Sequence, residues 1–173
     1  MGRFGEIAFT PAVQEEQARR GSRELYARAQ AKGAPNDALG EAEAAYLEQA
    51  DSFFLATVSE SGWPYVQHRG GPPGFLKVLS PTQIAFPDFR GNRQYISAGN
   101  AARDDRVAMI VLDYKRRQRL KLLGRLSFVE PASDPALARR LELPGYPAKV
   151  ERLALIEVAA FDWNCPQHIR PRR

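Results

Sequence analysis

Arginine dominates the residues of this sequence that could bind a ligand. The chain carries 25 lysine and arginine residues against 20 acidic ones, for a net charge of +5, and most of the basic residues are arginine. A guanidinium group can donate two parallel hydrogen bonds to phosphate oxygens, so this composition is typical of anion recognition. A GC-rich genome would produce the same excess of arginine over lysine, and composition alone leaves both explanations open.

The segment FPDFRGNRQ, residues 86–94, is a candidate anion site. Gly91 allows the backbone to approach a ligand, and Asn92 and Arg93 stand where a helix over 93–102 is expected to begin. The N–H groups at a helix N-terminus bind anions, and an arginine in the first turn adds a charged hydrogen bond. The loop predicts a site for a terminal phosphate, although it matches no glycine-rich nucleotide motif and an ordinary polar loop would look similar.

Two other segments carry polar groups in patterns that suit a ligand. In RLKLLGRLS, strand alternation places Arg119, Lys121 and Arg125 on one face, which is either an anion patch or a solvated basic surface. The C-terminal DWNCPQHIRPRR offers a tryptophan that can stack on a planar ligand and amides that can bond its edge. It also places Cys165 and His168 at a ligand-like spacing, but the sequence supplies too few further histidines and cysteines for a closed zinc site. A nucleophilic cysteine with a histidine base is an alternative without other support.

These residues must be positioned by a mainly β scaffold. Helices are expected over 11–32, between Thr10 and Gly33, and over 37–50, opened by Asp37. From Ser52 the period becomes that of antiparallel strands, about seven of them, at 52–59, 63–68, 75–80, 83–88, 106–114, 119–130 and 152–161. Further short helices are expected at 93–102 and 134–142.

The expected fold is a β-barrel with helices, in one domain over residues 1–173. Residues 1–50 form a helical N-terminal extension, and residues 52–168 form the barrel and the ligand site. The strand 106–114 is apolar on both faces, so one face can fill the barrel while the other must meet a helix or a second subunit. We therefore expect a homodimer.

The sequence predicts a cytoplasmic protein. It contains no run of 18 apolar residues that would span a membrane, and its start lacks the apolar region of a signal peptide. Its single cysteine, Cys165, cannot form an internal disulfide, which fits a reducing compartment.

Residues 52–168 resemble the FMN-binding split-barrel family related to pyridoxamine 5′-phosphate oxidase, and most closely its predicted flavin-nucleotide-binding subgroup. The resemblance rests on the strand order and on the segments WPYVQHRGGPPGFLKV, IAFPDFRGNRQYISAGNAARDDRVAMIVLDY, RLKLLGR and WNCPQHI. It implies an FMN split barrel and a homodimer that holds two FMN molecules at its interface.

The resemblance also implies which residues bind the cofactor. Along the flavin and its ribityl phosphate it places Gln67, His68, Arg69 and Gly70. Its phosphate-binding stretch corresponds to Asp88, Arg90, Asn92 and Arg93. Lys121 falls where a polar residue faces the cofactor. The residues expected to approach the ring from the partner subunit are Trp163, Asn164, Gln167 and His168.

This resemblance suggests why QHRGGPPGF, residues 67–75, separates two predicted strands that a two-residue turn could join. The segment would be a cofactor wall, in which His68 and Arg69 contact the flavin, the glycines let the backbone approach, and the prolines stiffen the bend. A wide hairpin loop is the alternative.

The sequence departs from the pyridoxamine 5′-phosphate oxidases proper in two places. Those enzymes carry Ser-Arg-Lys where this chain has Asn92-Arg93-Gln94, so one phosphate cation is missing. Their C-terminal arginine-histidine substrate motif has no counterpart here. The leading hypothesis is therefore an FMN-dependent oxidoreductase of unknown small-molecule substrate, and the alternative is a non-catalytic flavin carrier. We expect no nucleic-acid partner, because KRRQRLK and RPRR accompany no nucleic-acid-binding motif.

Overall fold

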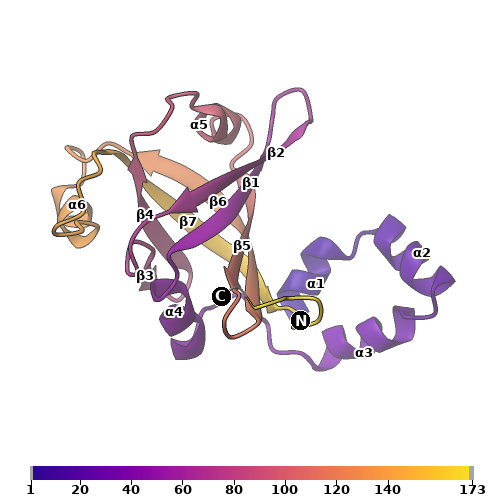
Figure 1. The fold of residues 1–173 in the computed structure, drawn as a ribbon. Coiled ribbons are helices and arrows are strands. Elements are labelled where there is room, and N and C mark those ends of the chain that lie inside the picture. The colour runs from indigo at the N-terminus through magenta and orange to yellow at the C-terminus, as the bar shows by residue number, and fades with distance from the viewer. Residues whose placement is uncertain (1, 172–173) are drawn as a thin grey trace.

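Helices at the N-terminal end are followed by a seven-stranded antiparallel sheet in the computed structural model, which describes residues 2–171 (Figure 1). The helices are α1 (Gly2–Ala8), α2 (Pro11–Arg19), α3 (Arg23–Lys32), α4 (Glu41–Glu48), α5 (Ile96–Ala101) and α6 (Pro135–Arg140). The strands are β1 (Ser52–Val58), β2 (Pro64–Gly70), β3 (Lys77–Ser80), β4 (Gln83–Phe89), β5 (Arg106–Asp113), β6 (Gln118–Val129) and β7 (Val150–Trp163). The predicted fold class, a β-barrel with helices, is confirmed.

The strands hydrogen-bond in the order β2-β1-β5-β6-β7-β4-β3, so β2 and β3 are the two ends of the sheet. β3 pairs with β4 only as far as Ala85, and beyond that point β4 keeps β7 as its neighbour on one side. The other side of β4, from Phe86 to Phe89, has no strand partner among residues 2–171. Pro87 lies in this part, where a residue without an N–H group is tolerated.

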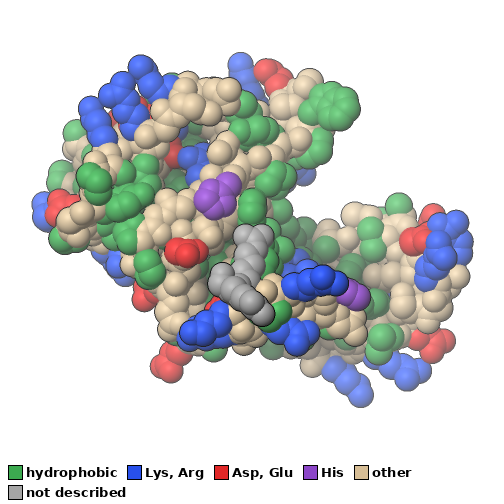
Figure 2. Space-filling model, in the orientation of Figure 1, with side chains coloured by type: hydrophobic (Ala, Val, Ile, Leu, Met, Phe, Trp, Pro, Cys, Tyr) green, Lys and Arg blue, Asp and Glu red, His purple; other side chains and the backbone are tan. Residues whose placement is uncertain are grey.

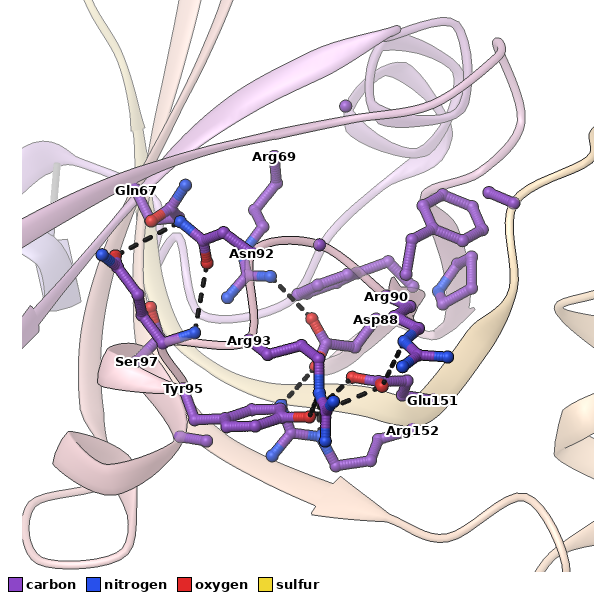
Figure 3. Close-up of a pocket in the computed structure, with 18 of the residues that line it drawn as sticks. Gln67, Arg69, Asp88, Arg90, Asn92, Arg93, Tyr95, Ser97, Glu151 and Arg152 are labelled. Carbon is purple, nitrogen blue, oxygen red and sulfur yellow. Dashed lines mark hydrogen bonds and ion pairs between the residues drawn. The ribbon is translucent and has the colours of Figure 1, made fainter.

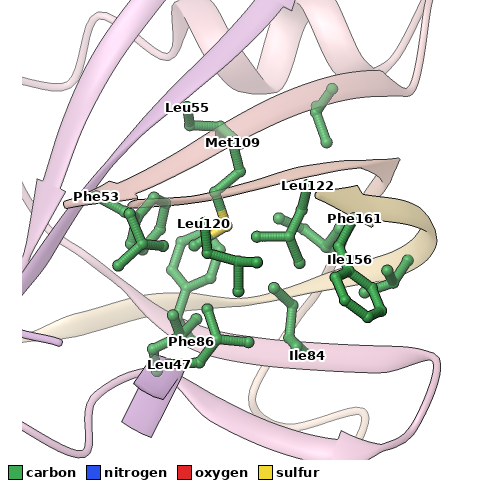
Figure 4. Packing of buried hydrophobic residues seen from close by; sticks show 14 of the residues in the cluster. Leu47, Phe53, Leu55, Ile84, Phe86, Met109, Leu120, Leu122, Ile156 and Phe161 are labelled. Atoms are coloured by element: carbon green, nitrogen blue, oxygen red, sulfur yellow. The ribbon is translucent and has the colours of Figure 1, made fainter. Parts of the chain in front are cut away.

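The core lies inside the curled sheet and follows from strand alternation. In β1, Phe53 and Leu55 are buried while Phe54 points outward. They pack with side chains from distant strands, including Phe86 on β4 and Leu122 on β6 (Figure 4). Full burial of each such side chain stabilises the folded state by about 1.5–3 kcal/mol. This gain favours a sheet that curls around them.

The helix predicted over 11–32 is wrong, because the chain forms α2 and α3 in its place. The break falls at Gly21, whose φ of 76° lies in the left-handed region that glycine adopts without strain. α1 was also not predicted. Gly33 ends α3, as expected.

The N-terminal helices cover the barrel only in part. α4 packs Leu47 into the core, and α1 packs on β7 through the buried Phe4. α2 and α3 pack on each other, α3 buries none of its residues, and the two helices stand away from the barrel as a separate lobe (Figures 1 and 2). Within residues 2–171, we find no helix with the length and apolar character needed to cross a bilayer.

Two element boundaries differ from the predictions in ways that matter for the site. The helix expected from Asp37 begins only at Glu41, after Gly40 donates its N–H to the Glu43 carboxylate at 3.0 Å. The last strand runs to Trp163, which pairs with Leu120 of β6. The strand predicted over 152–161 therefore runs two residues further than expected, and Trp163 belongs to the sheet.

Candidate functional site

A pocket of about 390 Å³ opens between β2 and the unpaired side of β4, within the size range of small-molecule sites. Its remaining walls come from the loop after β4, the start of α5 and the start of β7. The predicted site residues from β2 and from the segment 88–93 all line this pocket: Gln67, His68, Arg69, Gly70, Asp88, Arg90, Asn92 and Arg93.

β2 supplies one wall through alternate side chains. Tyr65, Gln67 and Arg69 are partly buried, and the Tyr65 hydroxyl donates to Gln67 Oε1. His68 lies exposed at the rim, with its ring edge-on to that of Phe54 at 5.4 Å between centroids. The wall therefore presents an amide and a guanidinium to the pocket.

Asp88 is a buried polar group of the pocket, with an exposed fraction of 4%. Arg69 Nη1 donates to its Oδ1 at 2.6 Å, and Arg152 donates to its Oδ2 from Nε at 3.1 Å and from Nη2 at 2.5 Å. Figure 3 shows the carboxylate between the two guanidinium groups. Asp88 and Arg152 are paired residues of β4 and β7, so the sheet register itself brings them together.

A β-bulge explains why two consecutive residues of β7 both line the pocket. Asp88 pairs with Arg152 but Phe89 pairs with Val150, so Glu151 is an extra residue in β7. Adjacent strand residues normally point to opposite faces, and a bulge can redirect one of them. Glu151 consequently joins Arg152 in the pocket wall.

The loop after β4 carries a second polar network (Figure 3). Arg93 Nε donates to the Tyr95 hydroxyl at 3.2 Å, and that hydroxyl donates to Glu151 Oε2 at 3.2 Å. Arg90 lies 3.6 Å from the same carboxylate. The hydrogen bond to Tyr95, together with the nearby charge of Glu151, raises the pKa of Arg93, which stays protonated at any physiological pH.

The loop is not the helix start that we expected. α5 begins at Ile96, so Asn92 and Arg93 precede it, and the prediction that they stand at a helix N-terminus is wrong. Arg93 and Tyr95 have φ values of 62° and 53°, uncommon for residues with side chains. Asn92 Oδ1 accepts the N–H of Gln94 at 3.2 Å, which stabilises this irregular turn.

The pocket is electropositive. Four arginines line it, Arg69, Arg90, Arg93 and Arg152, against the two carboxylates of Asp88 and Glu151, which leaves a net charge of +2. Arg69 Nε is buried and has no hydrogen-bond partner among residues 2–171. An unsatisfied buried donor is costly in a folded protein, and it suits a site that receives an acceptor from a ligand.

The remaining predicted site residues lie elsewhere in this chain. Lys121 pairs with Asp162 at 3.1 Å, and Trp163 donates its indole N–H to Glu43 at 2.7 Å. The Asn164 backbone N–H donates to Arg119 O, and Gln167 and His168 are exposed. Cys165 is exposed, and no metal-binding group of histidine, cysteine and carboxylates occurs in the described part of the chain.

The glycines of QHRGGPPGF do more packing than the sequence suggested. Gly70 lines the pocket, but Gly71 lies against the buried Phe75, and a Cβ there would meet the ring carbons at 2.8 Å. Gly71 is therefore required by the core, not by a ligand.

Sequence reasoning missed several residues of the pocket: Tyr65, Tyr95, Ser97, Tyr146, Glu151 and Arg152. Arg152 was visible only as the first residue of a predicted strand. Asp88 was predicted, but its pairing with Arg152 could be found only by knowing which strand lies beside β4. Arg152, on β7, also adds a fourth cation to the pocket. The loop after β4 lacks the lysine of the Ser-Arg-Lys run, so this cation comes from another strand.

Comparisons with known proteins agree with this architecture. A candidate pyridoxamine 5′-phosphate oxidase from Lactobacillus delbrueckii superposes with a TM-score of 0.54 at 19% identity, over 73% of this chain and 94% of its own. HupZ from Group A Streptococcus gives a TM-score of 0.52 at 11% identity, over 71% and 91%. An FMN-binding protein from Syntrophomonas wolfei gives 0.50 at 15% identity, over 87% and 96%. At such identities these likenesses show a shared fold.

No curated protein matches the sequence. The sequence profile of the family described as pyridoxamine 5′-phosphate oxidase matches residues 39–162, which span β1 to β7 and the whole of the pocket. The chain therefore belongs to the pyridoxamine 5′-phosphate oxidase family.

Proposed function

We propose that this protein is an FMN-binding flavoprotein that acts as an oxidoreductase on a small molecule. The observation that carries the proposal is the pocket beside β4, whose net charge of +2 matches the charge of one phosphate monoester, about −1.5 to −2 at pH 7. One structural neighbour is described as an FMN-binding protein, which supports the choice of cofactor.

The residues present fit a flavin mononucleotide. Arg90 and Arg93 would bind the phosphate by charged hydrogen bonds, and the unpartnered Arg69 Nε would gain an acceptor. Gln67 offers both a donor and an acceptor to the edge of a ring, and His68 lies at the rim. Riboflavin lacks the phosphate and FAD has a diphosphate with a bulky nucleoside, so we expect FMN to bind best.

When bound, the flavin would supply the electron transfer, and the protein would supply orientation and charge. The Gln67 amide would hold the ring edge, and the arginines would fix the phosphate end. The substrate would enter from the open side of the pocket, beside His68. A non-catalytic flavin carrier is the alternative.

The proposal includes a homodimer with the flavin at the interface. The outer face of β2, β1 and β5 carries exposed or half-buried apolar side chains, namely Phe54, Val58, Val66 and Ile110. Phe54 and Ile110 are paired residues on neighbouring strands, so the apolar surface is continuous. Such a surface is typical of a protein interface, and a permanent homodimer would bury more than roughly 2,000 Å² in total.

The tail would complete the site of the other subunit. Asn164, Gln167 and His168 do not line the pocket of their own chain, and two of these side chains are exposed. In a dimer through the apolar face, the exposed Gln167 and His168 would reach the partner's flavin, and the resemblance adds Asn164, Lys121 and Trp163 to this set. The lone exposed Cys165 suits a cytoplasmic, reducing location, which also forms part of the proposal.

The test is flavin binding by the purified protein. We expect a yellow protein, or an apoprotein that quenches FMN fluorescence at much lower concentration than it quenches riboflavin fluorescence. Equal affinity for the two flavins would refute the phosphate assignment. Reduction of the bound flavin by NADH or NADPH, followed by reoxidation with candidate acceptors, would separate an oxidoreductase from a carrier.

A further inference from the structure

We propose that Asp88 does not bind the cofactor but positions Arg69 and Arg152, and that Arg152 is a phosphate-binding residue of the pocket. The inference rests on the proposed function, and it assigns the specificity of the site for a phosphorylated flavin. It concerns a carboxylate that at first sight is misplaced, since a negative charge in an anion site repels the ligand.

The hydrogen bonds of Asp88 explain its presence. Both carboxylate oxygens are occupied by guanidinium donors, Oδ1 by Arg69 and Oδ2 by Arg152. The carboxylate is buried, at 4% exposure, so it offers little surface to a ligand. Its contacts are those of a group that fixes two cations.

Arg152 is held more tightly than the other arginines of the pocket. Besides its two hydrogen bonds to Asp88, its guanidinium lies over the Phe128 ring at 4.3 Å and over the Tyr95 ring at 5.2 Å. Its side chain is only 19% exposed. A guanidinium held by cation–π contacts and a forked hydrogen bond loses little further freedom when it binds an anion.

Donors remain on both arginines after Asp88 is satisfied. Arg69 uses Nη1 and Arg152 uses Nε and Nη2, which leaves Arg69 Nη2 and Nε and Arg152 Nη1 for a ligand. Of these, Arg69 Nε is buried and has no hydrogen-bond partner in the described part of the chain. Arg90 and Arg93 are exposed and linked through Glu151 and Tyr95, so they form the outer part of the same anion site.

The substitution Asp88→Asn separates this role from a purely electrostatic one, because the two predict opposite signs. If Asp88 is only a nearby negative charge, its neutralisation raises the net charge of the pocket and tightens FMN binding. If Asp88 positions the arginines, its neutralisation releases them and weakens FMN binding, on the order of 10- to 100-fold as for a lost charged hydrogen bond. Riboflavin binding should change little, since the effect acts through the phosphate.

The experiment measures FMN and riboflavin dissociation constants by flavin fluorescence for the wild type, Asp88→Asn, Arg152→Lys and Arg152→Met. Asp105→Asn is the matched control, because it also removes one carboxylate, paired with Arg125 at the surface and outside the pocket. Arg152→Lys keeps the charge but not the fork, and should weaken FMN binding with a native melting temperature. If Asp88→Asn does not fold, Arg152→Lys still tests whether the guanidinium of Arg152 binds the phosphate.

A second measurement keeps the inference independent of the flavin. Inorganic phosphate should raise the melting temperature of flavin-free wild type and of Asp105→Asn, and should do so much less for Asp88→Asn and Arg152→Met. A wild type that responds to phosphate but does not prefer FMN refutes the proposed function and leaves the anion site standing. Unchanged or tighter FMN binding in Asp88→Asn, or an equal phosphate response in all variants, overturns the inference.

Discussion

The substitution Tyr46→Phe tests how α4 is fixed to the barrel, and its effect should depend on pH in a defined way. Tyr46 is 7% exposed, and its hydroxyl lies 3.2 Å from Val111 O and 3.1 Å from Gln118 O, near the turn that joins β5 to β6. The ring packs edge-on against Trp163 at 4.7 Å, a contact that phenylalanine keeps. The change therefore removes one hydroxyl donor and creates no large cavity.

The expected loss at neutral pH is about 1 kcal/mol of the free energy of unfolding, the usual net value of one hydrogen bond. Burial raises the pKa of Tyr46 to about 12, well above the ordinary range of a tyrosine. A raised pKa in the folded state means that the unfolded chain loses this proton first as pH rises. The stability that Tyr46 contributes is thus complete below pH 10 and is lost between about pH 10 and pH 12.

The raised pKa corresponds to roughly 3 kcal/mol at high pH, which exceeds the contribution of the hydrogen bond. The wild type should be the more stable protein at pH 8, and the two proteins should have equal stability near about pH 11. Urea unfolding of both proteins between pH 8 and pH 11.5 measures the difference. A difference that stays constant over this range would refute the argument that the hydroxyl is buried and protonated in the fold.

Three further outcomes test the proposed site and assembly. Arg93→Ala should weaken FMN binding by about 1.5–3 kcal/mol in a fluorescence titration, and riboflavin binding should be unaffected. Val66→Asp should give a monomer in sedimentation, whereas Leu25→Asp, on the lobe and 66% exposed, should leave the dimer intact; a dimeric Val66→Asp protein would place the interface elsewhere. A chain ending at Asn164 should fold and dimerise but bind flavin poorly, and mixing it with Arg93→Ala chains should restore part of the activity through one intact site per heterodimer. Confirmed heterodimers without recovery would assign the tail to its own subunit or to no site.

Much of the fold could be read from short-range patterns. Alternation of basic and apolar residues identifies β6, because successive side chains of a strand must face opposite sides of the sheet. Runs rich in apolar, β-branched and aromatic residues identify β1 and β5. The ends of the helices were harder to predict. The helical pattern over 11–32 continues through Gly21, and only the backbone conformation of that residue shows that the chain turns there. The short helices α5 and α6 were placed to within a few residues.

The same locality explains which parts of the candidate site could be predicted. Gln67 to Gly70 and Asp88 to Arg93 are two continuous stretches, and the polar and glycine content of each marks it without knowledge of the fold. Their convergence in one pocket is a property of the sheet, since β2 and β4 come together only when the seven strands curl around the core.

Only the tertiary structure shows which side chains of the pocket pair with one another. Arg152 is 64 residues from Asp88, and their ion pair depends on the register of β4 against β7. Glu151 lines the pocket because of a β-bulge, which the alternation of residues in the sequence does not predict. Trp163 belongs to the sheet through its pairing with Leu120. Composition and alternation determine which residues can bind a phosphate and which must be buried. The relative placement of distant strands, set by packing of the core, determines which charges meet.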